Sequence, residues 1–114
     1  MAIAAAAVNQ FQTVTQVVGI NTTEVYEAPI GFVGIVLLAQ CTNTGTETET
    51  FNLGFRRENE NDIELIKAIP IPPDESASLL NGKLVLETGD KLVTFGSTTT
   101  DLKFVISVLE TTNI

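Results

Sequence analysis

The sequence predicts an all-β fold, namely a single antiparallel β-sandwich of jelly-roll-like type with about eight strands. Thr, Val, Ile and Leu are abundant, and Gly, Pro, Asn and Asp interrupt them at short intervals, as in short strands joined by turns. No stretch sustains the apolar period of about 3.6 residues that a packed helix needs. The 114 residues are enough for one domain with one core and too few for two ordinary domains.

The clearest strand signals come from alternating apolar and polar residues. Residues 51–57 alternate in this way, and so do residues 63–69, which predicts a hairpin around the polar tip Glu58–Asp62. Residues 33–41 are apolar in both registers, which predicts a central strand covered on both faces, or on one face by a neighbouring subunit. Near the C-terminus four apolar side chains share one face: Leu102, Phe104, Ile106 and Val108.

Proline, glycine and asparagine residues predict where the remaining connections between strands lie. Pro70, Pro72 and Pro73 predict an extended connection, because proline cannot donate to the interior of a ladder. The dipeptides Asn81-Gly82 and Gly89-Asp90 predict a double hairpin within residues 79–92. Residues 1–10 are uncharged and rich in alanine, so they predict an extended N-terminal arm, with the sandwich domain at residues 11–114.

The charge balance excludes two classes of partner. With 14 acidic and 6 basic residues, the net charge is −8, which disfavours nucleic acid and anionic membranes alike. The apolar start of the chain carries no basic region of a signal peptide and is too short to span a bilayer. Cys41 is the only cysteine, so no intrachain disulfide can form, and its apolar neighbours predict a buried side chain.

The residues that build active sites are scarce. The chain has no His, which removes the commonest general base and metal ligand, and no Trp, which weakens a carbohydrate-binding hypothesis. No nucleophile motif or phosphate-binding glycine pattern occurs, so we expect no catalytic residue, no cofactor and no enzymatic activity. The acidic run Glu58, Glu60, Asp62 and Glu64 fits a solvated hairpin tip; a cation site is the alternative, although the spacing matches no calcium loop.

Two segments resemble a known family. The first is Thr22–Phe32, a polar strand followed by the pattern Y-x-A-P-x-G and an apolar strand, and the second is Leu79–Leu92, with the string GKLVLETGD. Together with the closing strand Phe104–Glu110 they resemble the small β-sandwich virion structural proteins of tailed bacteriophages, over about residues 21–110. No functional residue is carried over, because the shared motif residues look structural.

The resemblance implies a virion protein, assembled in the host cytoplasm, that decorates and cements the capsid as a homo-oligomer, with a trimer favoured. Its partners would be the major capsid protein or other virion proteins. A tail, neck or baseplate component is one alternative, and a carbohydrate- or Ca²⁺-binding module is another. The N-terminal arm either frays or orders against a neighbouring subunit. The expected interface residues are Ala2, Ile3, Ala4, Val8, Phe11, Glu58, Glu60, Pro70 and Pro72.

Overall fold

The computed structural model describes residues 8–113, which form nine β-strands and no helix. The strands are β1 (Asn9–Val17), β2 (Thr23–Glu27), β3 (Phe32–Asn43), β4 (Glu49–Arg56), β5 (Ile63–Ile71), β6 (Ser76–Ser78), β7 (Leu84–Leu86), β8 (Lys91–Gly96) and β9 (Leu102–Thr112).

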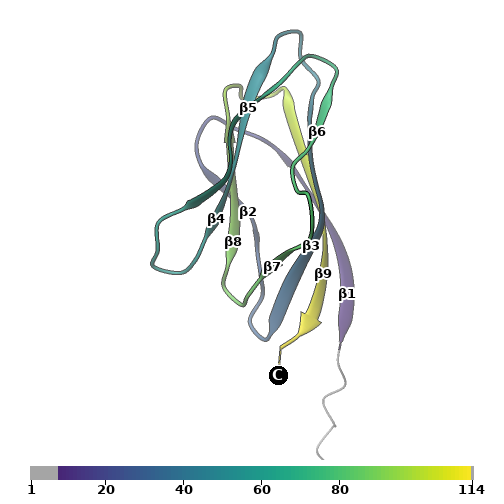
Figure 1. The fold of residues 1–114 in the computed structure, drawn as a ribbon, viewed down its shortest axis with the longest axis vertical. Coiled ribbons are helices and arrows are strands. Elements are labelled where there is room, and N and C mark those ends of the chain that lie inside the picture. Colours follow the sequence, from purple (N-terminus) through teal and green to yellow (C-terminus); the bar gives the residue numbers. More distant parts are fainter. Residues whose placement is uncertain (1–7, 114) are drawn as a thin grey trace, which may run out of the picture.

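The strands form two antiparallel sheets that face each other (Figure 1). Sheet A has the order β1-β9-β3-β6, with β7 also paired to β3, and sheet B has the order β2-β8-β4-β5. Strands β6 and β7 pair with different parts of β3, so they act as one interrupted edge strand. Counted in this way, the fold has two sheets of four strand positions each, which confirms the predicted sandwich of about eight strands.

The pairing of β6 and β7 shows that the predicted double hairpin at residues 79–92 is wrong. Both strands run antiparallel to β3 and neither pairs with the other, so Asn81-Gly82 lies in the interruption between them. The second turn does reverse the chain, but it leads from β7 in sheet A to β8 in sheet B. Gly89 adopts φ +87° there, a backbone conformation that glycine reaches without a steric penalty.

The hairpin of β4 and β5 is confirmed, with its polar tip between them. The expectation that Pro70 lies outside a strand is wrong, because Pro70 is in β5, opposite Thr50. Proline is tolerated there because β5 is the edge strand of sheet B and needs no donor on its open side. Two register shifts interrupt this pair, and Asn52 Oδ1 accepts a bond from the backbone N–H of Ala68, whose φ is +51°, at 2.8 Å.

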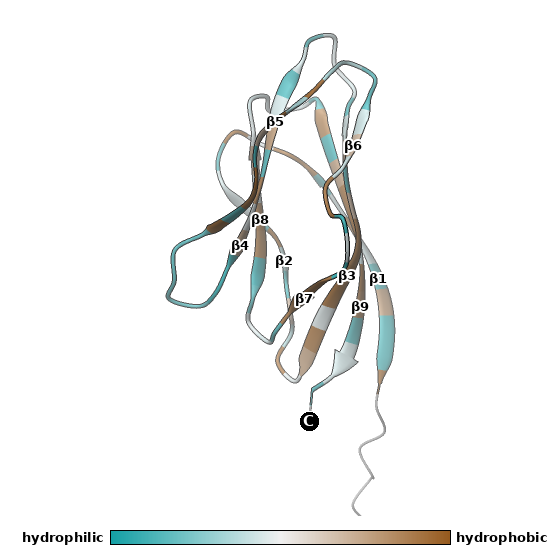
Figure 2. Cartoon of the chain, in the orientation of Figure 1, coloured by the Kyte–Doolittle hydropathy of each residue, from teal (hydrophilic) through white to brown (hydrophobic). Residues whose placement is uncertain are grey.

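The core lies between the two sheets and contains the predicted apolar face of β9. In Figure 2 the hydrophobic colouring runs along most of β3, whereas β1 alternates between hydrophilic and hydrophobic positions. The inward face of β3 is buried, but its outward face is not, since Leu37 and Leu38 are 38% and 40% exposed. Within residues 8–113 β3 is therefore covered on one face only; whether a neighbouring subunit covers the other stays a prediction.

Cys41 is fully buried on the inward face of β3, as predicted. Burial raises the pKa of its thiol to about 12, because the thiolate would lose its hydration. A raised pKa in the folded state means that the associated stability is complete below the pKa of the unfolded thiol and is lost as the pH rises above it.

The free energy of unfolding is therefore expected to fall by about 1 kcal/mol between pH 9 and pH 10 because of Cys41 alone. Urea titrations at both pH values measure this decrease. In Cys41→Ala the decrease should be smaller by that amount, since the variant has no thiol to ionise. Equal decreases in the two proteins would contradict the assignment.

Candidate interaction surfaces

The structure distributes the predicted interface residues over separate parts of the molecule. Val8 and Phe11 lie at the start of sheet A, 48% and 75% exposed, and β1 begins at Asn9, inside the predicted arm. Glu58 and Glu60 are exposed at the β4–β5 tip of sheet B. Pro70 and Pro72, both exposed, lie in and just after β5, while Ala2, Ile3 and Ala4 are outside the described residues.

The outward face of sheet A, which we call the A face, carries a row of apolar side chains. The register places Phe11 opposite Leu109, Leu109 opposite Ile35, and Ile35 opposite Val85, so one residue comes from each neighbouring strand. Phe11 is largely exposed and Val85 is 53% exposed, while the two central residues are half-buried. Leu38 extends the row along β3. The sequence prediction included Phe11 but not its neighbours in this row.

The A face also differs from the rest of the molecule in charge. Of the 14 acidic residues, only Glu110 belongs to a strand of sheet A, and its side chain is fully buried on the inward face. The strands of sheet A therefore present no carboxylate to solvent on this face, although the chain carries a net charge of −8. Lys103 is the charged residue that they do present, at the edge of a shallow hollow of about 500 Å³.

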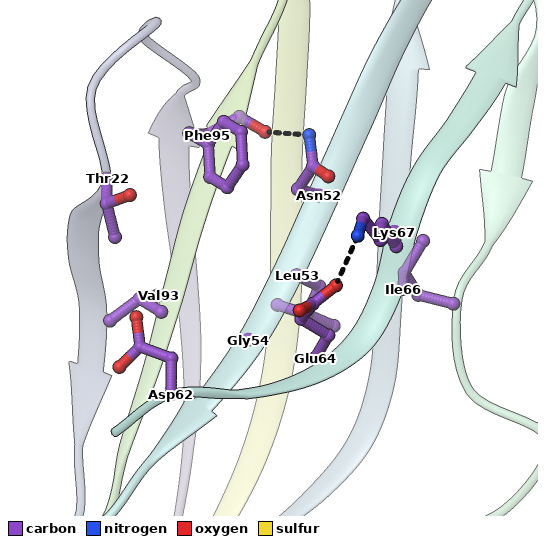
Figure 3. Close-up of a pocket in the computed structure, with 10 residues that line it drawn as sticks. All are labelled: Thr22, Asn52, Leu53, Gly54, Asp62, Glu64, Ile66, Lys67, Val93 and Phe95. Atoms are coloured by element: carbon purple, nitrogen blue, oxygen red, sulfur yellow. Dashed lines mark hydrogen bonds and ion pairs between the residues drawn. The ribbon is translucent and has the colours of Figure 1, made fainter. Parts of the chain in front are cut away.

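The strands of sheet B carry more charged side chains of both signs than those of sheet A. A hollow of about 250 Å³ lies over β4, β5 and β8, with Asn52 and Phe95 on one side and Glu64 and Lys67 on the other (Figure 3). Lys67 Nζ lies 3.6 Å from Glu64 Oε2, and Asn52 Nδ2 donates to the carbonyl of Phe95 at 3.3 Å. Lys67 and Glu64 thus form an ion pair, while Asn52 bonds to the backbone of the neighbouring strand.

One carboxylate of the acidic tip between β4 and β5, that of Asp62, is paired within its own hairpin. Arg56 donates to both carboxylate oxygens of Asp62, and this bidentate hydrogen bond lowers the pKa of Asp62. Arg57 pairs with Asp90, and with Glu87 of the turn before β8. Among residues 8–113 no group of three or more acidic or cysteine side chains is arranged to hold a metal ion. The alternative of a cation site at the tip thus gains no support.

A polar cluster around the buried carboxylate of Glu110 connects the two sheets, with the buried Tyr26 on one side and the exposed Gln10 and Gln12 on the other. Tyr26 of sheet B donates its hydroxyl hydrogen to Glu110 Oε2 of sheet A. Gln10 and Gln12, both on β1, donate to Glu110 Oε1 at 2.7 and 3.2 Å. Burial, and then the bond to Glu110, raise the pKa of Tyr26 well above its usual range. The Tyr26 hydroxyl is thus engaged by Glu110, and the cluster connects the two sheets.

Gly34 explains how Tyr26 fits between the sheets. Gly34 lies opposite Glu110 on β3, and a Cβ atom at this position would come within 2.9 Å of the Tyr26 hydroxyl and 3.3 Å of Val108 Cγ1. Sequence reasoning missed both Gly34 and Glu110. The signal for Glu110 was present, because it continues the alternate register of buried residues that runs from Leu102 to Val108.

Comparisons with known proteins add one observation, and it concerns the fold. No family model matches the sequence, and no curated protein does. A solved structure of a pilus protein, from a study of Bacillus endospore appendages described as a novel family of disulfide-linked pili, superposes with a TM-score of 0.59. The match covers 100% of this chain and 97% of that chain at 11% identity, which supports the β-sandwich architecture.

The described part of the chain contains no helix that is long and apolar enough to cross a membrane.

Proposed function

We propose that this chain is a non-enzymatic structural protein of a bacteriophage virion, a decoration protein that binds the outer capsid surface through the A face. The observation that carries the proposal is the contrast between the two outward faces. The A face combines an exposed apolar row with the absence of carboxylates, whereas the tips and the face of sheet B hold exposed acidic side chains. The choice of a bacteriophage capsid as the partner comes from the resemblance of the sequence to phage β-sandwich proteins.

The energetics of docking favour the A face over sheet B. Burying Phe11 and Val85 removes apolar surface from water at about 25 cal/mol per Å². Burying Glu64 or Glu58 would instead require a cation from the partner to offset the lost hydration. An acidic partner surface could add a contact to Lys103.

In this arrangement the chain stabilises the capsid by binding across its subunits. The A face bridges neighbouring capsid subunits, and the acidic residues of sheet B and its tips point away from the particle into solvent. An outward-facing negative surface keeps decorated particles apart by charge repulsion. Self-association of the chain into an oligomer would increase the number of simultaneous contacts with the capsid and so its avidity.

Binding of the purified chain to capsids assembled without it tests the proposal. Phe11→Glu places a carboxylate in the apolar row of the A face and is expected to weaken binding about 30-fold or more, the effect of losing an interface anchor worth about 2 kcal/mol. Ile63→Glu is the matched control, because Ile63 is a similarly exposed apolar residue, 61% exposed, on β5 of sheet B.

The control should bind within about twofold of the parent chain, since surface substitutions outside an interface cost little. If Ile63→Glu weakens binding as much as Phe11→Glu, the A face is not the docking surface. If the parent chain does not bind such capsids at all, the decoration role is wrong.

A tubular assembly, such as a phage tail or neck, is the second candidate. The structural neighbour favours it, because that protein belongs to a pilus. The neighbour's pili are disulfide-linked, whereas the single cysteine of this chain is buried in the core and unable to cross-link copies while the chain is folded. Copy number in the virion separates the two candidates: hundreds of copies indicate a capsid coat, and a small number indicates a tail or neck.

A further inference from the structure

The sandwich has four sheet edges, and three of them carry features that prevent pairing with another strand. Strand β2 is short, acidic and bulged between Glu24 and Tyr26. Strand β5 contains Pro70 and Ala68 with its positive φ, and its register is broken twice. The edge formed by β6 and β7 is divided into two segments of three residues. Bulges, prolines, charges and short lengths are the usual protection of an edge against added strands.

Strand β1 has none of these protective features. It is nine residues long, contains neither a charged residue nor a proline, and pairs with β9 in an unbroken register. A long, regular and uncharged edge strand is a template for another strand. The other three sheet edges of the molecule are protected, so β1 is the edge at which another strand can pair.

The hydrogen-bond pattern defines which groups of β1 are available. Thr112 donates its backbone N–H to the carbonyl of Val8 at 3.2 Å, and Val18 donates to Leu102 at 2.9 Å. Because these pairs alternate along an antiparallel ladder, the even-numbered residues of β1 bond to β9. The backbone N–H and C=O groups of the odd-numbered residues point away from the sheet, and within the described chain no hydrogen bond reaches them: Asn9, Phe11, Thr13, Thr15 and Val17.

We propose that the open edge of β1 pairs with β1 of a second copy of this chain, antiparallel and about a two-fold axis at Thr13. In this register Thr13 faces Thr13 of the second copy, Phe11 faces Thr15, and Asn9 faces Val17. The backbone N–H and C=O groups of all five outward-pointing residues then find hydrogen-bond partners in the second copy, so the edge is complementary to itself. The two A sheets then become one continuous sheet.

Side chains and charge support this choice of partner. Threonine opposite threonine, and an aromatic residue opposite a β-branched one, are favourable cross-strand pairs. Two chains that each carry a net charge of −8 repel each other most where carboxylates meet, and β1 contains none. The pairing also places the two apolar rows side by side on one extended face. A two-fold pair implies an even number of subunits, in place of the trimer expected from the resemblance.

Disulfide trapping of the full chain tests the register. In Thr13→Cys the two new thiols face each other across the axis, with Cα atoms about 5.5 Å apart, within the range that a disulfide spans. In the control Thr15→Cys the thiols lie about 13 Å apart along the strands, too far for a disulfide. Both changes are on the same exposed face, and the native Cys41 is buried, so background cross-linking is low.

Under mild oxidation we expect at least a tenfold excess of covalent dimer in Thr13→Cys over Thr15→Cys. Sedimentation equilibrium of the parent chain should give twice the chain mass of 12.2 kDa. Equal cross-linking in the two variants, a monomer at every concentration, or a trimer would each overturn the two-fold pairing. Capsid binding by the parent chain is a separate measurement, so a chain that binds capsids but fails here loses this inference and keeps its proposed function.

Discussion

Replacing Glu110 by alanine is expected to lower the free energy of unfolding by about 3 kcal/mol. The change removes the acceptor of the buried Tyr26 hydroxyl and leaves a small cavity between the sheets. An unpaired buried donor costs about 1–3 kcal/mol, and loss of packing adds to this. Urea unfolding measures the difference, and the melting temperature should fall by about 10 °C.

Glu110→Gln is the matched control for this prediction. Its amide oxygen can still accept from Tyr26 and its volume is nearly that of glutamate, so we expect a loss of about 1 kcal/mol. A loss below about 1 kcal/mol in the alanine variant would mean that the polar cluster does not fasten the two sheets.

Replacing Asn43 by alanine is expected to cost about 2–4 kcal/mol of folding stability. Asn43 is fully buried at the end of β3, and its Nδ2 donates to the carbonyls of Glu47 and Ile71 at 2.7 and 2.8 Å. Its Oδ1 accepts from the backbone N–H of Gly45 at 2.8 Å. Alanine would leave these three buried or half-buried backbone groups without partners. Chemical denaturation measures the loss.

Two controls identify the cause of that loss. Thr42→Ala changes the adjacent residue, whose exposed hydroxyl bonds to Ser76, and should cost no more than about 0.5 kcal/mol. Asn43→Asp keeps the volume but directs carboxylate oxygens at two carbonyls, so it should destabilise at least as much as alanine. An aspartate variant as stable as the parent would show that the hydrogen bonds of Asn43 contribute little.

The parts of the fold that the sequence predicted well are those in which one face of a strand is buried. Phe104 and Ile106 alternate with more exposed residues in β9 because the strand packs on one side only, and this period is visible without coordinates. The β4–β5 hairpin was predictable for the same reason.

The errors arose where the tertiary arrangement decides between local alternatives. Asn81-Gly82 favours a tight hairpin, yet the flanking segments gain more by pairing with β3 than with each other. Pro70 predicts the end of a strand, but proline is tolerated on an edge strand. Whether β5 is an edge strand depends on the strand order, which no local sequence pattern reveals.

The candidate interface was only partly predictable from the sequence. Phe11 was among the predicted interface residues, but its neighbours in the row, Leu109, Ile35 and Val85, come from strands far apart in sequence. The lack of carboxylates on the A face likewise depends on which segments join sheet A, because the acidic residues cluster in the strands of sheet B and in the loops.

Side-chain oxidation by hydroxyl radicals, compared between the free chain and the chain bound to its capsid, tests the central claim most directly. Phe11 and Val85 report on the A face, whereas Ile63 and Phe95, 61% and 40% exposed, report on sheet B. Docking through the A face predicts that Phe11 and Val85 become protected on binding while Ile63 and Phe95 oxidise as before. Protection of Ile63 and Phe95, with Phe11 and Val85 unchanged, would contradict the account.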